Sequence, residues 1–398
     1  MEGDGLMTRL LIVQYAGDYR EADRLRREEG KEIYFGHGYV LDQLDAIRAA
    51  GHEVGFLCCL ASAYWDTLAN GVTVIGGGAN PDRTPAPILR LIEHFAPTHL
   101  IIQGPMPALI RWSLARGVAL GVVLADSFAN PFYRLLRFRK LPGLLSDPRI
   151  TLVANHGANA ARALVALGVA ADRVMAWDYP HLRTPDLFAA KHRPSGPPFR
   201  LFYAGALSVK KGVGDLIRAV ALLHGRLDVQ LDIAGAGAGV GAGLRLARLA
   251  KKLGVADRVH FLGLVPNGEI PERMNAADAV VVPSRHSFPE GLPLTLYEAL
   301  ASRTPVIASD HPMFAGHLID RENAVIFRAG RPRELAEVIV ALMTDPSLYA
   351  RISAGAPAAW HHMQNPVKWG EMVRRWISEA PADRAWLAAH TLAGSAAR

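Results

Sequence analysis

The sequence predicts an α/β protein built from two Rossmann-like domains. Two observations support this class: short apolar runs alternate with amphipathic helical segments, and a proline-rich segment divides that alternation in two. Strands and helices that alternate in this way form a parallel sheet covered on both faces. The length of 398 residues fits two domains, each large enough to bury its own core.

The first half opens with an apolar run at 10–14, which is typical of a fully buried strand. A glycine-containing segment and a helical segment at 40–51 follow it, with Leu41, Leu44 and Ile47 on one face, and together they predict a βα unit. The pattern then recurs along this half. Further strands are expected at 53–58, 72–77, 98–103, 118–126 and 150–155, and helices at 87–95 and 108–117.

A segment with four prolines, at 183–199, shows no periodicity and predicts an interdomain linker. A second α/β series follows it. Its strands are expected at 199–205, 229–237, 259–263, 279–283, 305–309 and 323–327, and its helices at 214–225, 244–254 and 295–302. The predicted organisation is a first domain at 1–185, a linker at 186–199 and a second domain at 200–365. At 366–398 we expect a C-terminal helix, with packing back on the first domain as one option. The tail is expected to fray from about Ala380.

Composition, net charge and cysteine content limit the classes of function that the chain can have. Half of the residues are hydrophobic and 20% are charged, which indicates a globular chain. The net charge of +7 suits anionic partners, whether nucleotide phosphates, acidic lipid surfaces or nucleic acid. Cys58 and Cys59 are the only cysteines, so a disulfide framework is not expected and a reducing compartment is. No apolar run is long enough for a signal peptide or a membrane span, and a cytoplasmic protein is therefore expected.

The loop and helix at 283–309 form the most informative segment. Ligands in open α/β sheets bind outside the carboxyl ends of the strands, and this segment follows the strand at 279–283. It places Glu290 and Glu298 eight positions apart, with a helix predicted to start near Leu294. Unsatisfied N–H groups at a helix start can hold a diphosphate. A carboxylate one turn into the helix can accept hydrogen bonds from ribose hydroxyls.

This segment resembles the Glu-x7-Glu motif of retaining glycosyltransferases with the GT-B architecture, the group usually called family 4. The blocks at 202–220, 231–237, 259–266 and 277–284 precede it in the family's order, so the resemblance covers nearly all of the second domain. It implies two Rossmann-like domains facing across a cleft. It also implies transfer of a sugar from a nucleotide diphosphate donor, with retention, to a saccharide or lipid-linked acceptor held by the first domain.

The resemblance assigns roles to individual residues. Glu298 is expected to bind the ribose, Glu290 to orient the transferred sugar, and Lys211 to neutralise the leaving diphosphate. The other implied donor contacts are Gly205, Leu264, Val265, Gly291, Leu292, Pro293, Leu294 and Thr295. The alternative is a structural role, in which Glu290 caps a helix and Glu298 lies on a solvated helix face. Ala206 departs from the family, which usually has an arginine there, and Lys210 is a candidate substitute. No cofactor and no metal are expected, since no Asp-x-Asp or His/Cys cluster appears.

The first domain matches the family less well. Gly36 and Gly38 resemble its glycine-bearing loop, which would let the backbone approach the donor phosphate, although a simple turn explains them equally. His37 between them is interpreted as a loop histidine. Asp126, where the family often has a histidine, is expected at the end of its strand as a ligand of a sugar hydroxyl or as a base. The alternative makes Asp126 a turn former with Ser127.

Aromatic and basic residues alternate at 132–143, which favours an anionic membrane surface over a surface helix or an RNA-binding face. A peripheral protein on the inner face of the membrane is thus one option, and no nucleic-acid partner is expected. Two rival functions stay open. One is an inverting GT-B enzyme or a sugar-nucleotide epimerase, with Asp126 or His37 as base. The other is a sugar-nucleotide-binding protein without turnover. A dehydrogenase is disfavoured because no Gly-x-Gly-x-x-Gly follows the first strand.

Overall fold

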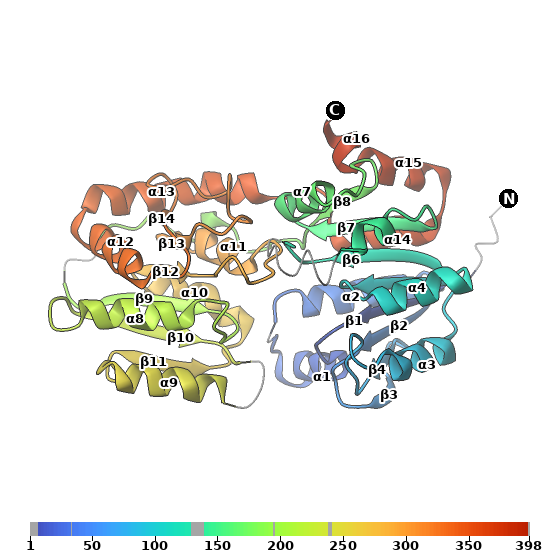
Figure 1. Cartoon of the computed structure of the whole chain (residues 1–398), viewed down its shortest axis with the longest axis horizontal. Helices are drawn as coiled ribbons and strands as arrows, with labels where there is room; N and C mark the ends of the chain where they lie inside the picture. Colours follow the sequence, from blue (N-terminus) through green and yellow to red (C-terminus); the bar gives the residue numbers. More distant parts are fainter. Residues whose placement is uncertain (1–6, 33, 129–138, 194–195, 238–240, 397–398) are drawn as a thin grey trace. The chain divides into compact units, whose positions relative to one another are not determined.

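The computed structural model describes residues 7–32, 34–128, 139–193, 196–237 and 241–396 (Figure 1). Contacts along the chain divide it into two compact units. The first comprises Met1–Pro180, Glu290–Leu292 and Asn365–Arg398, and the second comprises His181–Pro289 and Pro293–Gln364. Each unit is an α/β domain around its own sheet, which confirms the predicted fold class.

The first unit contains an eight-stranded sheet in the order β3-β4-β2-β1-β5-β6-β7-β8. All neighbours pair in parallel except β3 and β4. The strand order reverses direction at β1 and β5, which is the switch point of a doubly wound sheet. The strands are β1 (Arg9–Gln14), β2 (Glu53–Cys58), β3 (Tyr64–Thr67), β4 (Thr73–Gly76), β5 (His99–Gln103), β6 (Ala119–Leu124), β7 (Ile150–His156) and β8 (Val174–Trp177).

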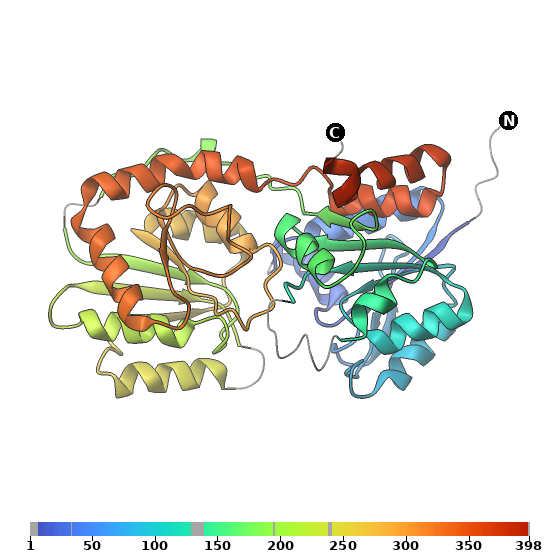
Figure 2. The same ribbon diagram turned by 45° about the horizontal axis from the view of Figure 1, so that its top comes forward.

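Helices cover both faces of this sheet (Figure 2). They are α1 (Tyr19–Glu29), α2 (His37–Ala49), α3 (Pro85–Phe95), α4 (Pro107–Arg116), α6 (Leu141–Leu145), α7 (Ala158–Ala166), α14 (Trp369–Ser378), α15 (Pro381–Ala389) and α16 (Leu392–Ala396). The parallel strands have apolar, mostly buried interiors because helices cover both faces of this part of the sheet. The antiparallel edge strand β3 is the exception, since none of its residues is buried.

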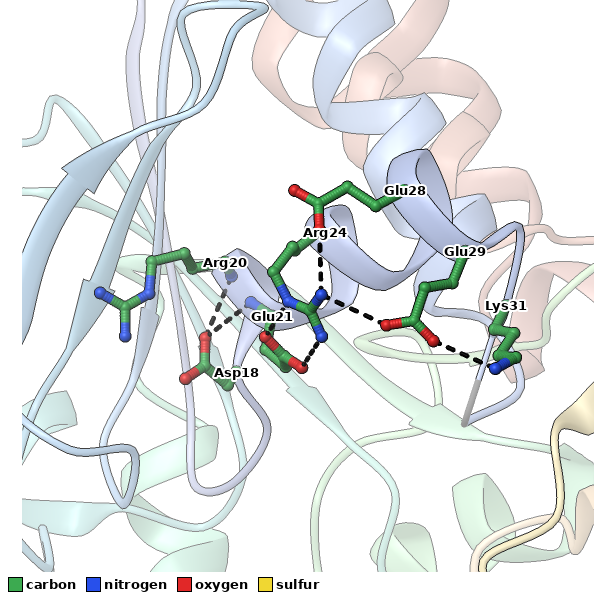
Figure 3. A network of polar contacts seen from close by, with 7 residues as sticks. All are labelled: Asp18, Arg20, Glu21, Arg24, Glu28, Glu29 and Lys31. Atoms are coloured by element: carbon green, nitrogen blue, oxygen red, sulfur yellow. Dashed lines mark hydrogen bonds and ion pairs between the residues drawn. The ribbon is translucent and has the colours of Figure 1, made fainter.

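Helix α1 has no apolar stripe, and sequence analysis did not predict it. Only Tyr19 is buried. On the exposed face, the guanidinium of Arg24 donates hydrogen bonds to the carboxylates of Glu21, Glu28 and Glu29 (Figure 3). The side chain of Asp18 accepts hydrogen bonds from the first free N–H groups of the helix. Ion pairs at helical spacing stabilise such a segment by only a few tenths of a kcal/mol each, roughly, so capping contributes as much as the network does.

The C-terminal segment packs on the first unit, where helix α14 buries Trp369 and Trp376. In Figure 2 this segment is drawn in red and lies beside green strands of the first unit, although those strands are far from it in the sequence. The expectation of a frayed tail is wrong. Helices α15 and α16 form there, Thr391 pairs with Met175, and the amide of Ala393 donates to the carbonyl of Ala171, so tertiary contacts hold a segment whose composition alone suggested fraying.

The second unit contains a six-stranded parallel sheet in the order β11-β10-β9-β12-β13-β14. Its switch point lies between β9 and β12. The strands are β9 (Phe199–Ala204), β10 (Val229–Ala234), β11 (Val259–Gly263), β12 (Ala279–Val282), β13 (Val306–Ser309) and β14 (Val325–Phe327). The helices are α8 (Val213–Leu223), α9 (Ala242–Lys252), α10 (Ile270–Ala276), α11 (Leu294–Ala301), α12 (Pro332–Thr344) and α13 (Pro346–Met363).

Most predicted elements are present, and the missed strands have weak local patterns. Strand β3 has four residues, none of them buried, and lies at a sheet edge. Strand β8 is only four residues long, although all four are buried. The strand expected at 118–126 ends at Leu124, which leaves Asp126 in the following turn.

Candidate active site

Two loops of the second unit meet at the carboxyl ends of neighbouring strands. One loop, at 205–212, follows β9, and the other, at 283–293, follows β12. Gly212 has φ 74°, and a Cβ atom there would lie 2.0 Å from the carbonyl oxygen of Pro283. The amide of Arg285 donates to the carbonyl of Lys210 at 2.8 Å. The loops are therefore in direct backbone contact, which only glycine permits at position 212.

An ion pair between the buried Asp215 and the partly exposed Arg285 reinforces this contact, and sequence analysis missed it. The guanidinium of Arg285 donates to both carboxylate oxygens of Asp215, at 2.8 and 2.7 Å. Asp215 is 2% exposed, and its carboxylate raises the pKa of Arg285. Such two-pronged pairing fixes orientation as well as distance. Asp215 thus ties the loop after β12 to the first turn of α8, which begins at Val213.

Lys211 lies in the loop after β9 and reaches the loop after β12. Its ammonium nitrogen is 4.3 Å from the centroid of the Phe288 ring. Its amide donates to the hydroxyl of Ser208 at 3.1 Å, which shapes the turn. The side chain of Lys211 therefore brings a positive charge to the place where the two loops meet, and an aromatic face stabilises that charge.

The neighbouring Gly205 has φ 146°, and its carbonyl oxygen would lie 1.9 Å from a Cβ atom on Gly235. Glycine at both positions lets the ends of β9 and β10 touch. The carbonyl of Ala206, the position that departs from the family, accepts a hydrogen bond from the hydroxyl of Tyr203 at 2.8 Å. The backbone of this loop thus has a defined shape without the arginine that the family carries.

Glu298 lies on α11, which begins at Leu294 as predicted, with Pro293 preceding its first turn. The side-chain amide of Asn267 donates to Oε1 of Glu298 at 2.6 Å. Asn267 follows β11 and comes directly after the segment with Leu264, which is half exposed, and Val265, which is buried. This bond connects the proposed ribose ligand with the segment proposed to lie beside the base.

The start of α11 carries the remaining predicted residues. The hydroxyl of Thr295 lies 3.4 Å from the carbonyl of Ala204, and the two residues bring the helix start close to the end of β9. Glu290 is 5% exposed, and chain contacts group Glu290, Gly291 and Leu292 with the first unit. The structure thus places Lys211, Thr295 and Glu298 around one sheet edge of the second unit, with Glu290 on the loop that leads to it.

In the first unit, Gly36 caps α2 with φ 88°, and a Cβ atom there would lie 3.2 Å from the ring of Tyr179. The amide of Gly38 donates to a carboxylate oxygen of Glu32 at 2.9 Å. Between them, His37 packs against Tyr19 with ring centroids 5.0 Å apart, and burial lowers the pKa of His37 to about 4. An imidazole with this pKa stays neutral near pH 7.

Asp126 follows β6, and its carboxylate accepts a hydrogen bond from the amide of Phe128 at 2.8 Å. Its own amide donates to the side chain of Asn155 at 3.2 Å, and that side chain donates back to the carbonyl of Asp126 at 2.9 Å. A carboxylate bonded to the amide two residues on is the geometry of the turn-forming alternative.

Sequence analysis also missed His156, which is the last residue of β7 and pairs with Asp178 at 3.1 Å. Its signal was a titratable side chain at the carboxyl end of a predicted strand, which is also where Asp126 was expected.

Two other expectations concern metals and membranes. Within the described ranges, no group of three or more His, Cys, Asp or Glu side chains could hold a metal, and no helix is long and apolar enough to cross a membrane. Most of the segment at 132–143 lies outside the described residues, although Arg139 and Lys140 are described and exposed.

Comparison with known proteins identifies the second unit. The family model described as "Glycosyl transferases group 1" matches residues 186–358. D-inositol 3-phosphate glycosyltransferase 1 of Catenulispora acidiphila is 33% identical over 218 residues, 52% of this chain and 51% of that protein. Alpha-D-kanosaminyltransferase of Streptomyces kanamyceticus is 31% identical over 163 residues, 40% of this chain and 41% of that protein. The alignments span about half or less of these relatives' own length.

Solved structures extend the likeness to nearly the whole chain. HepE of Anabaena in complex with UDP-glucose has a TM-score of 0.66 at 18% identity and covers 94% of this chain and 98% of its own. WaaG, a glycosyltransferase involved in lipopolysaccharide biosynthesis, has a TM-score of 0.65 at 17% identity and covers 93% of this chain and 100% of its own. At these identities the likeness shows the fold, which is GT-B. The chain therefore has the GT-B fold, and its residues 186–358 match the family model of the glycosyl transferases group 1.

Proposed function

We propose that this chain transfers a sugar from a nucleotide diphosphate donor to an acceptor hydroxyl, with retention of anomeric configuration. One observation carries the proposal: the loops after β9 and β12 are locked together at a switch point of the second sheet, with Lys211 and the start of α11 beside them. Ligands bind outside the strand ends at such a point. The chemistry needs positioning and charge stabilisation of a leaving diphosphate more than it needs a nucleophile.

Each predicted donor residue has a chemical task in this proposal. The ammonium of Lys211 and the N–H groups at the start of α11 neutralise the diphosphate as the glycosidic bond breaks. Glu298, held by Asn267, accepts hydrogen bonds from the ribose. Glu290 orients the transferred sugar. The pair between Asp215 and Arg285 holds the two loops at a constant separation while the diphosphate is bound.

The names of similar proteins suggest which ligands to test first. HepE has been solved with UDP and with UDP-glucose, so a UDP-sugar is the first donor to examine. The curated relatives carry names that refer to inositol 3-phosphate and to kanosaminyl transfer. A saccharide, a polyol or a lipid-linked sugar bound by the first unit is the proposed acceptor. The proposed anionic membrane surface rests on the sequence at 132–143.

A thermal-shift panel of UDP-, GDP-, ADP- and dTDP-sugars tests donor binding, because a ligand that binds the folded chain raises its melting temperature. Release of nucleoside diphosphate in the presence of saccharide acceptors then tests turnover. Lys211→Ala should lower turnover about 100-fold with a smaller loss of binding, since negative charge grows on the leaving group in the transition state. Lys252→Ala, on α9, is the matched control. A melting shift without any nucleoside diphosphate release would favour the binding-protein alternative.

A further inference from the structure

The first unit contains a buried histidine–carboxylate pair at the carboxyl edge of its sheet. His156 is the last residue of β7, and Asp178 directly follows β8. Nε2 of His156 lies 3.1 Å from Oδ1 of Asp178, and the two residues are 5% and 0% exposed. The imidazole stacks on the indole of Trp177, with centroids 4.6 Å apart and an interplanar angle of 27°. Packing therefore fixes the plane of the ring, and the carboxylate fixes its rotation.

Asp178 has the partners that a buried carboxylate needs. The amide of Tyr179 donates to Oδ1 at 2.7 Å, and Nζ of Lys368 lies 3.9 Å from Oδ2. The backbone of Asp178 pairs with Val367 and Trp369, so the segment that returns to the first unit anchors it. A buried carboxylate without such partners would cost several kcal/mol, roughly, and these contacts offset that cost.

This arrangement selects one tautomer of His156. An ionised carboxylate only accepts hydrogen bonds, so the tautomer of His156 that pairs with it carries its proton on Nε2 and donates that proton to Asp178. Nδ1 is then the nitrogen with the lone pair. A second-neighbour carboxylate that orients an imidazole in this way is a recurrent device for presenting one nitrogen to a substrate or a metal.

The position of His156 is where a ligand of the first unit is expected. Strand pairing aligns Leu124 of β6 with Asn155 of β7, so His156 lies beside the turn that contains Asp126. The carboxyl ends of parallel strands form the ligand-binding edge of such sheets. A second pair, His99 with Glu379 at 3.1 Å, provides a contrast because His99 is the first residue of β5 and lies at the opposite edge.

We propose that Nδ1 of His156 accepts a hydrogen bond from a hydroxyl group of the acceptor that the first unit binds, and that Asp178 is the positioning residue that holds the imidazole for this contact. The hydroxyl belongs to a saccharide or polyol acceptor, or to water when no acceptor is present. This inference rests on the proposed function. Asp126, whose carboxylate shapes its own turn, then borders this hydroxyl site.

The variant His156→Gln tests the contact. A glutamine amide reaches the position of Nε2 and can still donate to Asp178, but it has no group at the position of Nδ1. Nucleoside diphosphate release from a mixture of UDP-, GDP-, ADP- and dTDP-glucose, with water as acceptor, should fall about 10- to 100-fold, the loss of one hydrogen bond to the acceptor. The melting temperature and the shift caused by UDP should stay near those of the wild type. His99→Gln, the control, should release nucleoside diphosphate at the wild-type rate.

A measurement without substrate checks the tautomer. Long-range ¹H–¹⁵N spectra of the histidine rings should show His156 protonated at Nε2, and Asp178→Asn should change that pattern. Wild-type rates in His156→Gln, or protonation at Nδ1, would overturn this inference alone. A wild-type chain that releases no nucleoside diphosphate from any of the four donors, either with water or with saccharide acceptors, would instead overturn the proposed function, and this inference with it.

Discussion

At the scale of single residues, three charged side chains of the candidate donor site are each held by a particular neighbour. Asn267 holds Glu298, Asp215 holds Arg285, and the ring of Phe288 lies against Lys211. Held side chains lose little conformational freedom when a ligand binds, so more of each contact contributes to affinity.

The first residue-scale prediction concerns Glu298. Glu298→Gln removes the charge that would strengthen hydrogen bonds to a ribose, and it places an amide against the amide of Asn267. Affinity for the nucleotide should fall by about 1.5–3 kcal/mol, measured by titration calorimetry with UDP. Glu337→Gln, on the exposed face of α12, should bind UDP as the wild type does. Equal affinity in Glu298→Gln and the wild type would remove the ribose role.

The second residue-scale prediction concerns pH. Burial lowers the pKa of His37 to about 4, below the ordinary value near 6.5 that it recovers on unfolding. Between these values the unfolded chain binds more protons than the folded chain, so stability falls as pH falls from about 6.5 to about 4. The melting temperature should therefore drop less between pH 7 and pH 5 in His37→Gln than in the wild type. In a control variant that replaces the exposed His94, the melting temperature should drop between pH 7 and pH 5 as much as in the wild type. If His37→Gln also shows the wild-type drop in melting temperature, the acid sensitivity comes from other groups.

At the scale of elements, the donor site depends on how closely two loops approach. Gly212 precedes α8 as its N-cap and lies against the carbonyl of Pro283, while Arg285 bonds across the same junction. Strands β9 and β12 are neighbours in the sheet, so their following loops meet without any long connection. The geometry of this junction, rather than any one side chain, sets where Lys211 lies.

Gly212→Ala tests this junction. The new Cβ atom would lie 2.0 Å from the carbonyl oxygen of Pro283, so the loops must separate. Gly225→Ala is the matched control, because Gly225 has φ 77° against 74° for Gly212 and no atom lies within 4 Å of its Cβ position. Both variants carry the left-handed strain of about 1–2 kcal/mol. Only Gly212→Ala should also abolish the UDP-induced rise in melting temperature. Equal UDP-induced shifts in the two variants would show that the junction does not control binding.

At the scale of the whole molecule, the first unit is assembled from segments that are distant in the sequence. The first unit takes in Asn365–Arg398, whose helix α14 adds Trp369, Met372, Val373 and Trp376 to its core. Burial of one such side chain contributes about 1.5–3 kcal/mol. The last helices differ, because α15 and α16 contain no buried residues.

Two truncations separate these contributions. A chain ending at Gln364 loses α14 and should unfold in its first unit far below the wild-type temperature, as followed by hydrogen exchange of strands β1 and β5. A chain ending at Glu379 keeps α14 and should lose only the surface contacts of α15 and α16, with a small change in melting temperature. Similar protection of β1 and β5 in both truncated chains would show that α14 does not support the first unit.

The sequence by itself determined the two α/β series and the start of α11 at Leu294, because these depend on periodicity and on spacing within one segment. The donor residues of the second unit were implied by the family resemblance, and their roles stay predictions. Local pattern failed for α1, which has charges in place of an apolar stripe, and for the short strands β3 and β8. It also misjudged the tail, whose helices depend on contacts with distant strands. These elements depend on neighbours that a local window does not contain.

Only the tertiary structure decided which polar residues act in pairs. Asp215 and Arg285 are 70 positions apart, Asn267 and Glu298 are 31 apart, and His156 and Asp178 are 22 apart. Strand order brings the first and the last of these pairs together, because β9 lies beside β12 and β7 beside β8. A hydrogen bond depends on a distance of about 3 Å, which periodicity along the chain does not encode. The sequence could thus name the chemistry of the donor site, while the fold selected the side chains that hold it in place.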